Sequence, residues 1–166
     1  MQIYTIGHGK IAMEEFLGLL EYHHIELIAD VRSEPVSRWA SHFNRSSLER
    51  ILNPAGIRYA YMGDKLGGRP QIPELYNGDE ILYDKLKEIP FYREGIDELL
   101  KLAEEQRVCL LCSEEDPSEC HRSLLIAQTL LEQGADVIHI RHSGEIINEL
   151  NLPHNQQLRF TLKGSP

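Results

Sequence analysis

The chain has 166 residues, of which 42% are hydrophobic and 26% charged, and its formal net charge is −9. This length and composition are ordinary for one globular domain. The negative charge argues against sequence-blind binding to nucleic acid, which needs many basic residues to displace counterions. Residues 31–70 differ from the rest, because their seven basic and three acidic side chains give a net charge of +4, and this local excess suits a confined anion site.

No apolar stretch approaches the roughly 20 residues of a membrane span, so no membrane partner is expected. Residues 1–7 enter a strand-like run at once, without a basic leader. The three cysteines are an odd number, and two of them lie close together on a predicted strand, which makes a poor disulfide framework. Together these features predict a cytoplasmic protein.

The first half of the chain alternates short apolar runs with amphipathic segments. These predict a strand over residues 3–6, a helix over 12–23, a strand over 25–31, a short helix that begins at the capping-box match Ser46–Glu49 and ends at Leu52, and a third strand over 57–61. A strand, a helix and a second strand within about 30 residues have the size of one right-handed βαβ unit. Residues 63–79 contain four glycines and two prolines, which predicts a long loop of the kind kept for function or left mobile.

The second half continues this pattern. It predicts helical segments over 81–86 and 94–106, a strand over 108–111, a helix over 117–133, a last core strand over 137–140, a short helix near 145–150 and an alternating tail with Leu158, Phe160 and Leu162. Asp116 at the N-cap, Pro117 at the first position and Gly134 after the end set the limits of the 117–133 helix. We therefore expect a single α/β domain over residues 1–166, with a mainly parallel central sheet flanked by helices in three layers.

Several predicted strands end in titratable side chains. His8 follows the first strand, Asp30 and Arg32 the second, Cys112 and Glu114 the fourth, and Arg141 and His142 the last. The carboxyl ends of parallel strands share one edge of a sheet, so we expect these side chains to converge there. The segment from Cys112 through an acidic turn to Cys120, His121 and Arg122 is the richest in chemistry.

Cys112 could be a reactive thiol. It precedes a predicted helix N-terminus by a few residues, where the helix dipole and His121 or Arg122 would favour the thiolate. A buried structural cysteine is the alternative, and it is favoured for Cys109 inside the strand. The phosphatase spacing of a cysteine, five residues and an arginine is absent, because Ser118 occupies the arginine position.

A zinc ion could be bound by Cys112, Cys120 and His121, with His8 or Asp30 as the fourth ligand. Adjacent residues of a helix point about 100° apart, however, so Cys120 and His121 would not both reach one ion. We therefore expect no metal. We also expect no cofactor, because the Gly7-His8-Gly9 turn lacks the third glycine of a dinucleotide-binding loop.

An anion pocket is the third possibility. Arg32, Arg38 and Arg122 could bind a phosphate, helped by His8 and by the free amides at the helix start. Asp30 or Glu114 could then be a general base or nucleophile, and His8 or His121 the general acid. Ion pairs between these arginines and Asp30 or Glu114, which would only order the loops, are the alternative.

The chain resembles the domain of unknown function 488 family over nearly its whole length. The carrying segments are Thr5–His8, Asp30-Val31-Arg32 with Pro35, Ser37-Arg38 and Phe43, Leu66–Gly68, the pattern Leu111-Cys112-x-Glu114-x-x-Pro117-x-x-Cys120-His121-Arg122, and Val137–Ile140. Gly9 departs from the family, which usually has a serine there. The resemblance implies a compact α/β fold and a set of shared positions that includes Cys120, but no reaction. Asp30-Val31-Arg32 is also similar to a strand end of the rhodanese fold, whose catalytic cysteine loop is short and glycine-bearing, unlike residues 113–119.

These observations predict an enzyme, a hydrolase or group transferase, that acts on a small anionic, phosphate- or nucleotide-like substrate at the carboxyl edge of the sheet. The expected catalytic residues are Asp30, Cys112, Glu114 and His121, and the expected substrate-binding residues are His8, Arg32, Arg38 and Arg122. Two alternatives stay open. One is a non-catalytic module that binds nucleotides or nucleic acid through the basic segment 31–70, and the other is a thiol-dependent transferase that uses Cys112.

Overall fold

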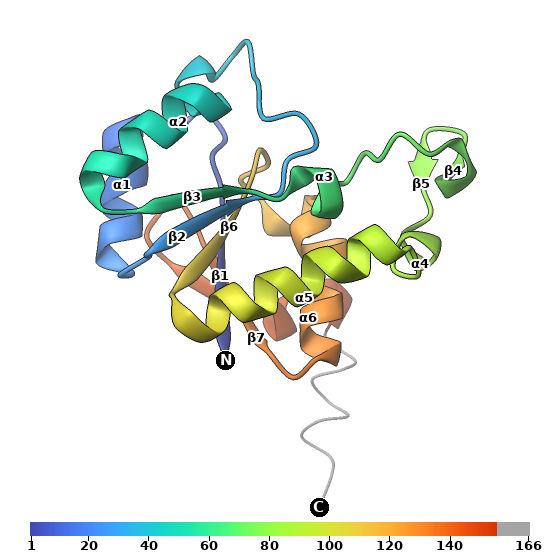
Figure 1. Cartoon of the computed structure of the whole chain (residues 1–166). Helices are drawn as coiled ribbons and strands as arrows, with labels where there is room; N and C mark the ends of the chain where they lie inside the picture. Colours follow the sequence, from blue (N-terminus) through green and yellow to red (C-terminus); the bar gives the residue numbers. More distant parts are fainter. Residues whose placement is uncertain (156–166) are drawn as a thin grey trace, which may run out of the picture.

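Six strands form one central sheet in the computed structural model, which describes residues 1–155 (Figure 1). The strands are β1 (Gln2–Gly7), β2 (Leu27–Asp30), β3 (Arg58–Tyr61), β6 (Val108–Cys112), β7 (Asp136–Ile140) and β8 (Ile146–Asn148). Their order is β3-β2-β6-β1-β7-β8, and the first five are parallel, while β8 pairs antiparallel with β7. The expected mainly parallel sheet is confirmed.

Helices cover both faces of the sheet. One face packs against α1 (Met13–Tyr22) and α2 (Arg45–Leu52), and the other packs against α5 (Pro90–Glu105), a π-helical segment (Arg122–Ala127) and α6 (Gln128–Glu132). Within β6, Val108 and Leu110 belong to the core under α5 and α6, and Cys109 and Leu111 to the core under α1 and α2. Because strand residues alternate between faces, Cys112 points to the α5 and α6 side of the sheet edge.

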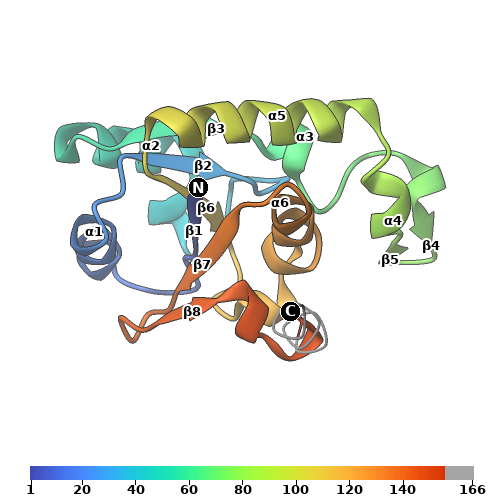
Figure 2. The same cartoon turned by 90° about the horizontal axis from the view of Figure 1, so that it is seen from below.

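A small subdomain-like projection lies beside the sheet, on the far side from α1 (Figures 1 and 2). It is formed by residues 67–86, which include the hairpin of β4 (Tyr76–Asn77) and β5 (Glu80–Ile81) and α4 (Tyr83–Leu86), while α3 (Gly63–Leu66) precedes it and packs against α5. The predicted 63–79 loop therefore contains short elements of its own. Within residues 1–155, no helix combines the length and the apolar character needed to cross a bilayer.

The prediction of one continuous helix over residues 117–133 is wrong, because the segment is broken at Cys120. Asp116 does cap a turn, since its Oδ1 accepts from the backbone N–H of Ser118 at 2.9 Å. That turn ends after Glu119, Cys120 is extended with φ −122° and ψ 145°, and helical structure resumes only at the π-helical segment. The carboxyl-terminal part of the segment then continues as α6.

Two smaller expectations are also corrected. The predicted helix near 145–150 is strand β8 followed by a 3₁₀ turn over Glu149–Asn151, because Ile146 and Ile147 pair with β7. The capping box at Ser46–Glu49 does not form: α2 begins at Arg45, and the Oδ1 of Asn44 accepts from the backbone N–H of Ser37 instead. The alternating tail with Leu158, Phe160 and Leu162 lies outside the described residues.

Candidate functional site

Three strand ends meet at the centre of the sheet edge. In the order β2-β6-β1, Arg32 follows β2, Cys112 ends β6 and His8 follows β1. The backbone N–H of His8 donates to the carbonyl of Cys112 at 2.9 Å, and the Arg32 guanidinium lies 3.2 Å from the Nε2 of His8. The structure thus brings these three residues together, as the parallel-strand argument predicts.

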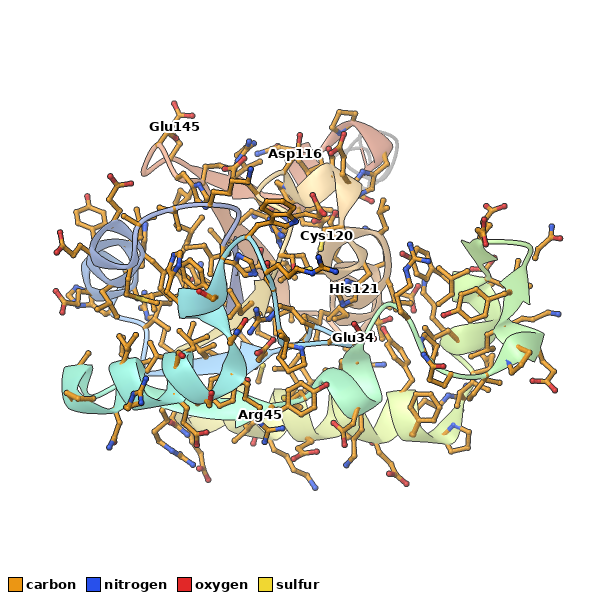
Figure 3. The ribbon with its side chains drawn as sticks, turned by 90° about the horizontal axis from the view of Figure 1, so that it is seen from above. Glu34, Arg45, Asp116, Cys120, His121 and Glu145 are labelled. Carbon is orange, nitrogen blue, oxygen red and sulfur yellow. The ribbon has the colours of Figure 1, made fainter. Side chains whose placement is uncertain are left out.

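A cleft of about 1060 Å³ opens above this edge. Arg32, Cys112 and Glu114 line it from the sheet, Cys120 and His121 from the broken helix, and Arg69, Tyr76 and Tyr83 from the projection. Figure 3 shows Cys120, His121 and Glu34 grouped near the middle of the molecule, whereas Asp116 and Glu145 lie toward its periphery. The volume suits a small molecule, since ligand pockets usually fall in the range of about 300–1,000 Å³.

Two thiols and an imidazole form a cluster in the wall of the cleft. The Sγ atoms of Cys112 and Cys120 are 2.7 Å apart, and the Nδ1 of His121 lies 3.7 Å from each of them. Cys112 and Cys120 are only 5% and 3% exposed. The argument that adjacent Cys120 and His121 diverge by about 100° is therefore wrong, because Cys120 is extended and does not belong to a helix.

The two thiols of this cluster differ in acidity. The Cys120 thiol donates to the Cys112 sulfur, and this bond, with help from His121 and Arg122, holds the pKa of Cys112 well below its ordinary value despite burial. The same bond and burial raise the pKa of Cys120. Of the two thiols, Cys112 is therefore the one whose thiolate form is favoured, and Cys120 is the hydrogen-bond donor of the pair. Burial alone raises the pKa of Cys109, which is fully enclosed in the sheet.

Arg122 is fully buried beneath the loop that follows β6. Its guanidinium donates to the Thr5 hydroxyl at 3.1 Å, to the Glu115 carbonyl at 2.9 Å and to the Glu114 carbonyl. Among the described residues, no carboxylate lies within 4 Å of it, so its positive charge is balanced by no ion pair there. Arg122 fixes the loop and places a cation near the sulfur atoms, but it does not line the cleft.

Asp30 is fully buried and committed to two partners. Its carboxylate accepts from Arg32 at 2.9 and 2.7 Å and from the Tyr59 hydroxyl at 2.6 Å. Burial and the Asp30 charge in turn raise the pKa of Tyr59. An ion pair that only orders the loops is the alternative to anion binding, and Arg32 and Asp30 form such a bidentate pair. The pair turns one side of the Arg32 guanidinium away from the cleft. Asp30 itself does not line the cleft.

His8 is held as a neutral imidazole. Its Nδ1–H donates to the Gly9 carbonyl at 2.8 Å, which leaves Nε2 as the acceptor from Arg32. Burial lowers the pKa of His8, with a smaller contribution from the Arg32 charge. His8 therefore supports Arg32 from below and does not line the cleft.

The remaining expected residues divide between the cleft and the surface. Glu114 is exposed and lines the cleft, whereas Arg38 lies exposed on the loop after β2 and does not line it. Sequence reasoning missed Tyr59, although the alternation of Ile57, Tyr59 and Tyr61 placed it on the strand next to β2. It also missed Arg69, Tyr76 and Tyr83. The prediction of a functional loop over residues 63–79 could have included the first two, whereas Tyr83 lies beyond it.

Comparison with known proteins yields one match. A family model described as Domain of unknown function DUF488 matches residues 12–129. No curated protein and no solved structure matches the chain. The matched range contains every residue of the thiol and imidazole cluster, together with Arg32 and Arg69.

Proposed function

Because the chain belongs to the DUF488 family, whose description names no reaction, we propose from the site itself that it is an enzyme, a hydrolase or group transferase, acting on a small anionic substrate. The observation that carries the proposal is the cluster of Cys112, Cys120 and His121 in the wall of the cleft. Hydrophobic packing does not require two thiols and an imidazole at contact distance, whereas catalysis uses such groups.

The walls of the cleft support a nucleotide-like substrate. Tyr76 and Tyr83 offer aromatic surfaces, and the exposed guanidinium of Arg69 offers a partner for a phosphate. Four exposed carboxylates at the rim, of Glu34, Asp64, Glu114 and Glu119, would repel a long polyanion. This rim favours a small ligand over nucleic acid.

Thermal unfolding tests this proposal. Nucleoside phosphates, sugar phosphates and inorganic phosphate are added to the purified chain, and the midpoint temperature is measured. A ligand at 100 times its Kd stabilises by about 2.7 kcal/mol, which corresponds to about 5–11 °C for a chain of this size. Arg69→Ala should remove the shift and the matched control Arg38→Ala should preserve it, because Arg38 lies outside the cleft. The absence of any shift with the unmodified chain would remove the proposal's main support.

A second candidate is a thiol-dependent transferase, in which the Cys112 sulfur itself takes up the transferred group as the leaving group departs. The 2.7 Å contact with the Cys120 thiol favours it, because this donor stabilises a thiolate at Cys112. Alkylation by iodoacetamide, followed by mass spectrometry of the modified peptides, tests it. Cys112 should react at pH values well below the roughly 8.5 of free cysteine, and Cys120→Ala should raise the midpoint. A midpoint near 8.5 in the unmodified chain would exclude an activated thiol.

A pair of reduced thiols also requires a reducing compartment. The cytosol keeps cysteines reduced, so a cytoplasmic location is part of this proposal. The three cysteines are unbridged in the structure. Fractionation of cells that express the chain tests the location.

A further inference from the structure

We propose that Cys112, Cys120 and His121 bind one Zn²⁺ ion whose fourth coordination position opens into the cleft. This inference deepens the proposed function and rests on it, since the ion would serve the substrate of the same cleft. The three ligand atoms all lie within 4.8 Å of one another. Two thiolates, one imidazole and an open position form one of the donor sets of catalytic zinc.

The sulfur-to-nitrogen distances fit a tetrahedral ion, whereas the sulfur-to-sulfur distance is about 1 Å too short. Zinc bonds of about 2.3 Å to sulfur and about 2.0–2.1 Å to nitrogen imply separations of about 3.6 Å between sulfur and nitrogen and about 3.8 Å between the two sulfurs. Both sulfur-to-nitrogen separations are 3.7 Å. The sulfurs are 2.7 Å apart, so they must separate by about 1 Å when the ion enters.

His121 is already oriented as a metal ligand. Its Nε2–H donates to the Val31 carbonyl at 3.0 Å, which leaves Nδ1 unprotonated and directed at the two sulfurs. An outer hydrogen bond of this kind is the usual support of a zinc-binding histidine. Gly68 leaves room for the ring, because a Cβ at that position would lie 2.8 Å from the Cγ of His121.

The two residues considered as a fourth zinc ligand, His8 and Asp30, already use their side chains in other hydrogen bonds. His8 is bonded to Arg32 and to the Gly9 carbonyl, and Asp30 to Arg32 and Tyr59. The fourth position therefore goes to water or to the substrate. Zinc would displace the Cys120 proton, so that two thiolates cancel the charge of Zn²⁺, while Arg122 adds a buried positive charge nearby. That excess favours hydroxide or an anionic group at the open position.

Cobalt and zinc binding to the full chain tests the site directly. The reduced, chelator-treated protein is titrated with Co²⁺, and a 1:1 complex should show thiolate-to-cobalt charge transfer and the intense visible bands of a tetrahedral ion. Zinc should displace the cobalt. Zinc should also protect Cys112 and Cys120 from iodoacetamide in the unmodified chain, as read by mass spectrometry. Failure to bind either ion stoichiometrically overturns the inference.

Variants identify the ligands. Cys112→Ser, Cys120→Ser and His121→Ala should each lower zinc affinity at least 100-fold, and Cys109→Ala, which removes a cysteine outside the cluster, should not. Gly68→Ala should lower affinity by about 10–100-fold, because it displaces the imidazole without removing a ligand. If the cysteine variants bind zinc as tightly as the unmodified chain, these residues are not the ligands. If thiol titration shows only a disulfide under reducing conditions, the pair is not available to a metal.

The failure of this inference is distinguishable from failure of the proposed function. Thermal stabilisation by phosphates is measured on both the zinc-free and the zinc-loaded protein. Stabilisation without any zinc binding would overturn the metal site and leave the thiolate candidate. Zinc binding without stabilisation of either form by any anion would leave the metal site and remove the proposed substrate class.

Discussion

Asp30→Asn should destabilise the protein strongly, although the side chain keeps its size. The substitution removes the negative charge that faces Arg32 in a place where both groups are almost fully enclosed, at 0% and 3% exposure. Breaking a buried pair by neutralising one partner costs about 3–5 kcal/mol, because the other charge is left uncompensated. The midpoint of thermal unfolding should therefore fall by about 6–20 °C, at about 2–4 °C per kcal/mol for a chain of this length.

Urea unfolding followed by circular dichroism measures the effect. The matched control is Glu98→Gln, which neutralises the exposed partner of Lys65 and should have a much smaller effect, since water screens that pair. A double variant, Asp30→Asn with Arg32→Met, should recover part of the loss because no buried charge remains. If Asp30→Asn unfolds within about 1 kcal/mol of the unmodified chain, the pair does not hold the β2 end, and the assignment of Asp30 to a supporting role is refuted.

Two further predictions concern the loop after β6. Gly7→Ala should cost about 3 kcal/mol, because the new Cβ would lie 1.6 Å from the Glu114 carbonyl oxygen. Gly18→Ala, in an open helical position, should instead stabilise by about 0.5–1 kcal/mol in the same urea assay, and equal effects of the two variants would refute the steric argument. Glu115→Gln should cost about 1 kcal/mol at pH 7, since Arg141 lowers the pKa of Glu115 to about 2. A carboxyl group whose pKa is lowered on folding stabilises the folded protein fully above its ordinary pKa of 4.5. The difference in unfolding free energy between the unmodified chain and Glu115→Gln should therefore shrink as the pH falls from 4.5 toward about 2. A difference of the same size at about pH 2 would contradict this.

Apolar periodicity was sufficient to predict the sheet. Strands β1, β2, β6 and β7 are buried on both faces, so each appears in the sequence as a mainly apolar run, in which Thr5, Asp30 and His139 are the buried polar exceptions. Strand β8 has only three residues and lies at the sheet edge, where its pairing with β7 decides its structure. A three-residue segment carries too little periodicity to distinguish a strand from a helix.

Convergence of the site residues was predictable, but their roles were not. Parallel strands bring His8, Arg32 and Cys112 to one edge whatever their side chains do. Whether an arginine faces a ligand or its own chain depends on partners distant in sequence. Arg122 is an example, because the Thr5 hydroxyl that accepts from it is 117 positions away. Arg38 lies exposed on the loop after β2 and does not line the cleft, so the binding role predicted for it stays a prediction from the sequence.

The break at Cys120 decides which chemistry is open to the cluster. In a continuous helix, Cys120 and His121 would diverge, and no single ion or substrate atom could contact both. The extended residue turns the Cys120 sulfur over Cys112, and the next residue returns to helical angles, with φ −59° and ψ −23°, so that the imidazole turns toward the same point. The backbone N–H of Arg122 then donates to the Cys120 sulfur at 3.5 Å in place of a helical bond. A π-helical segment follows directly, and such segments are frequent at functional sites. The irregular backbone therefore brings Cys120 and His121, which are neighbours in sequence, to Cys112 on β6, and these three residues form the three-donor centre.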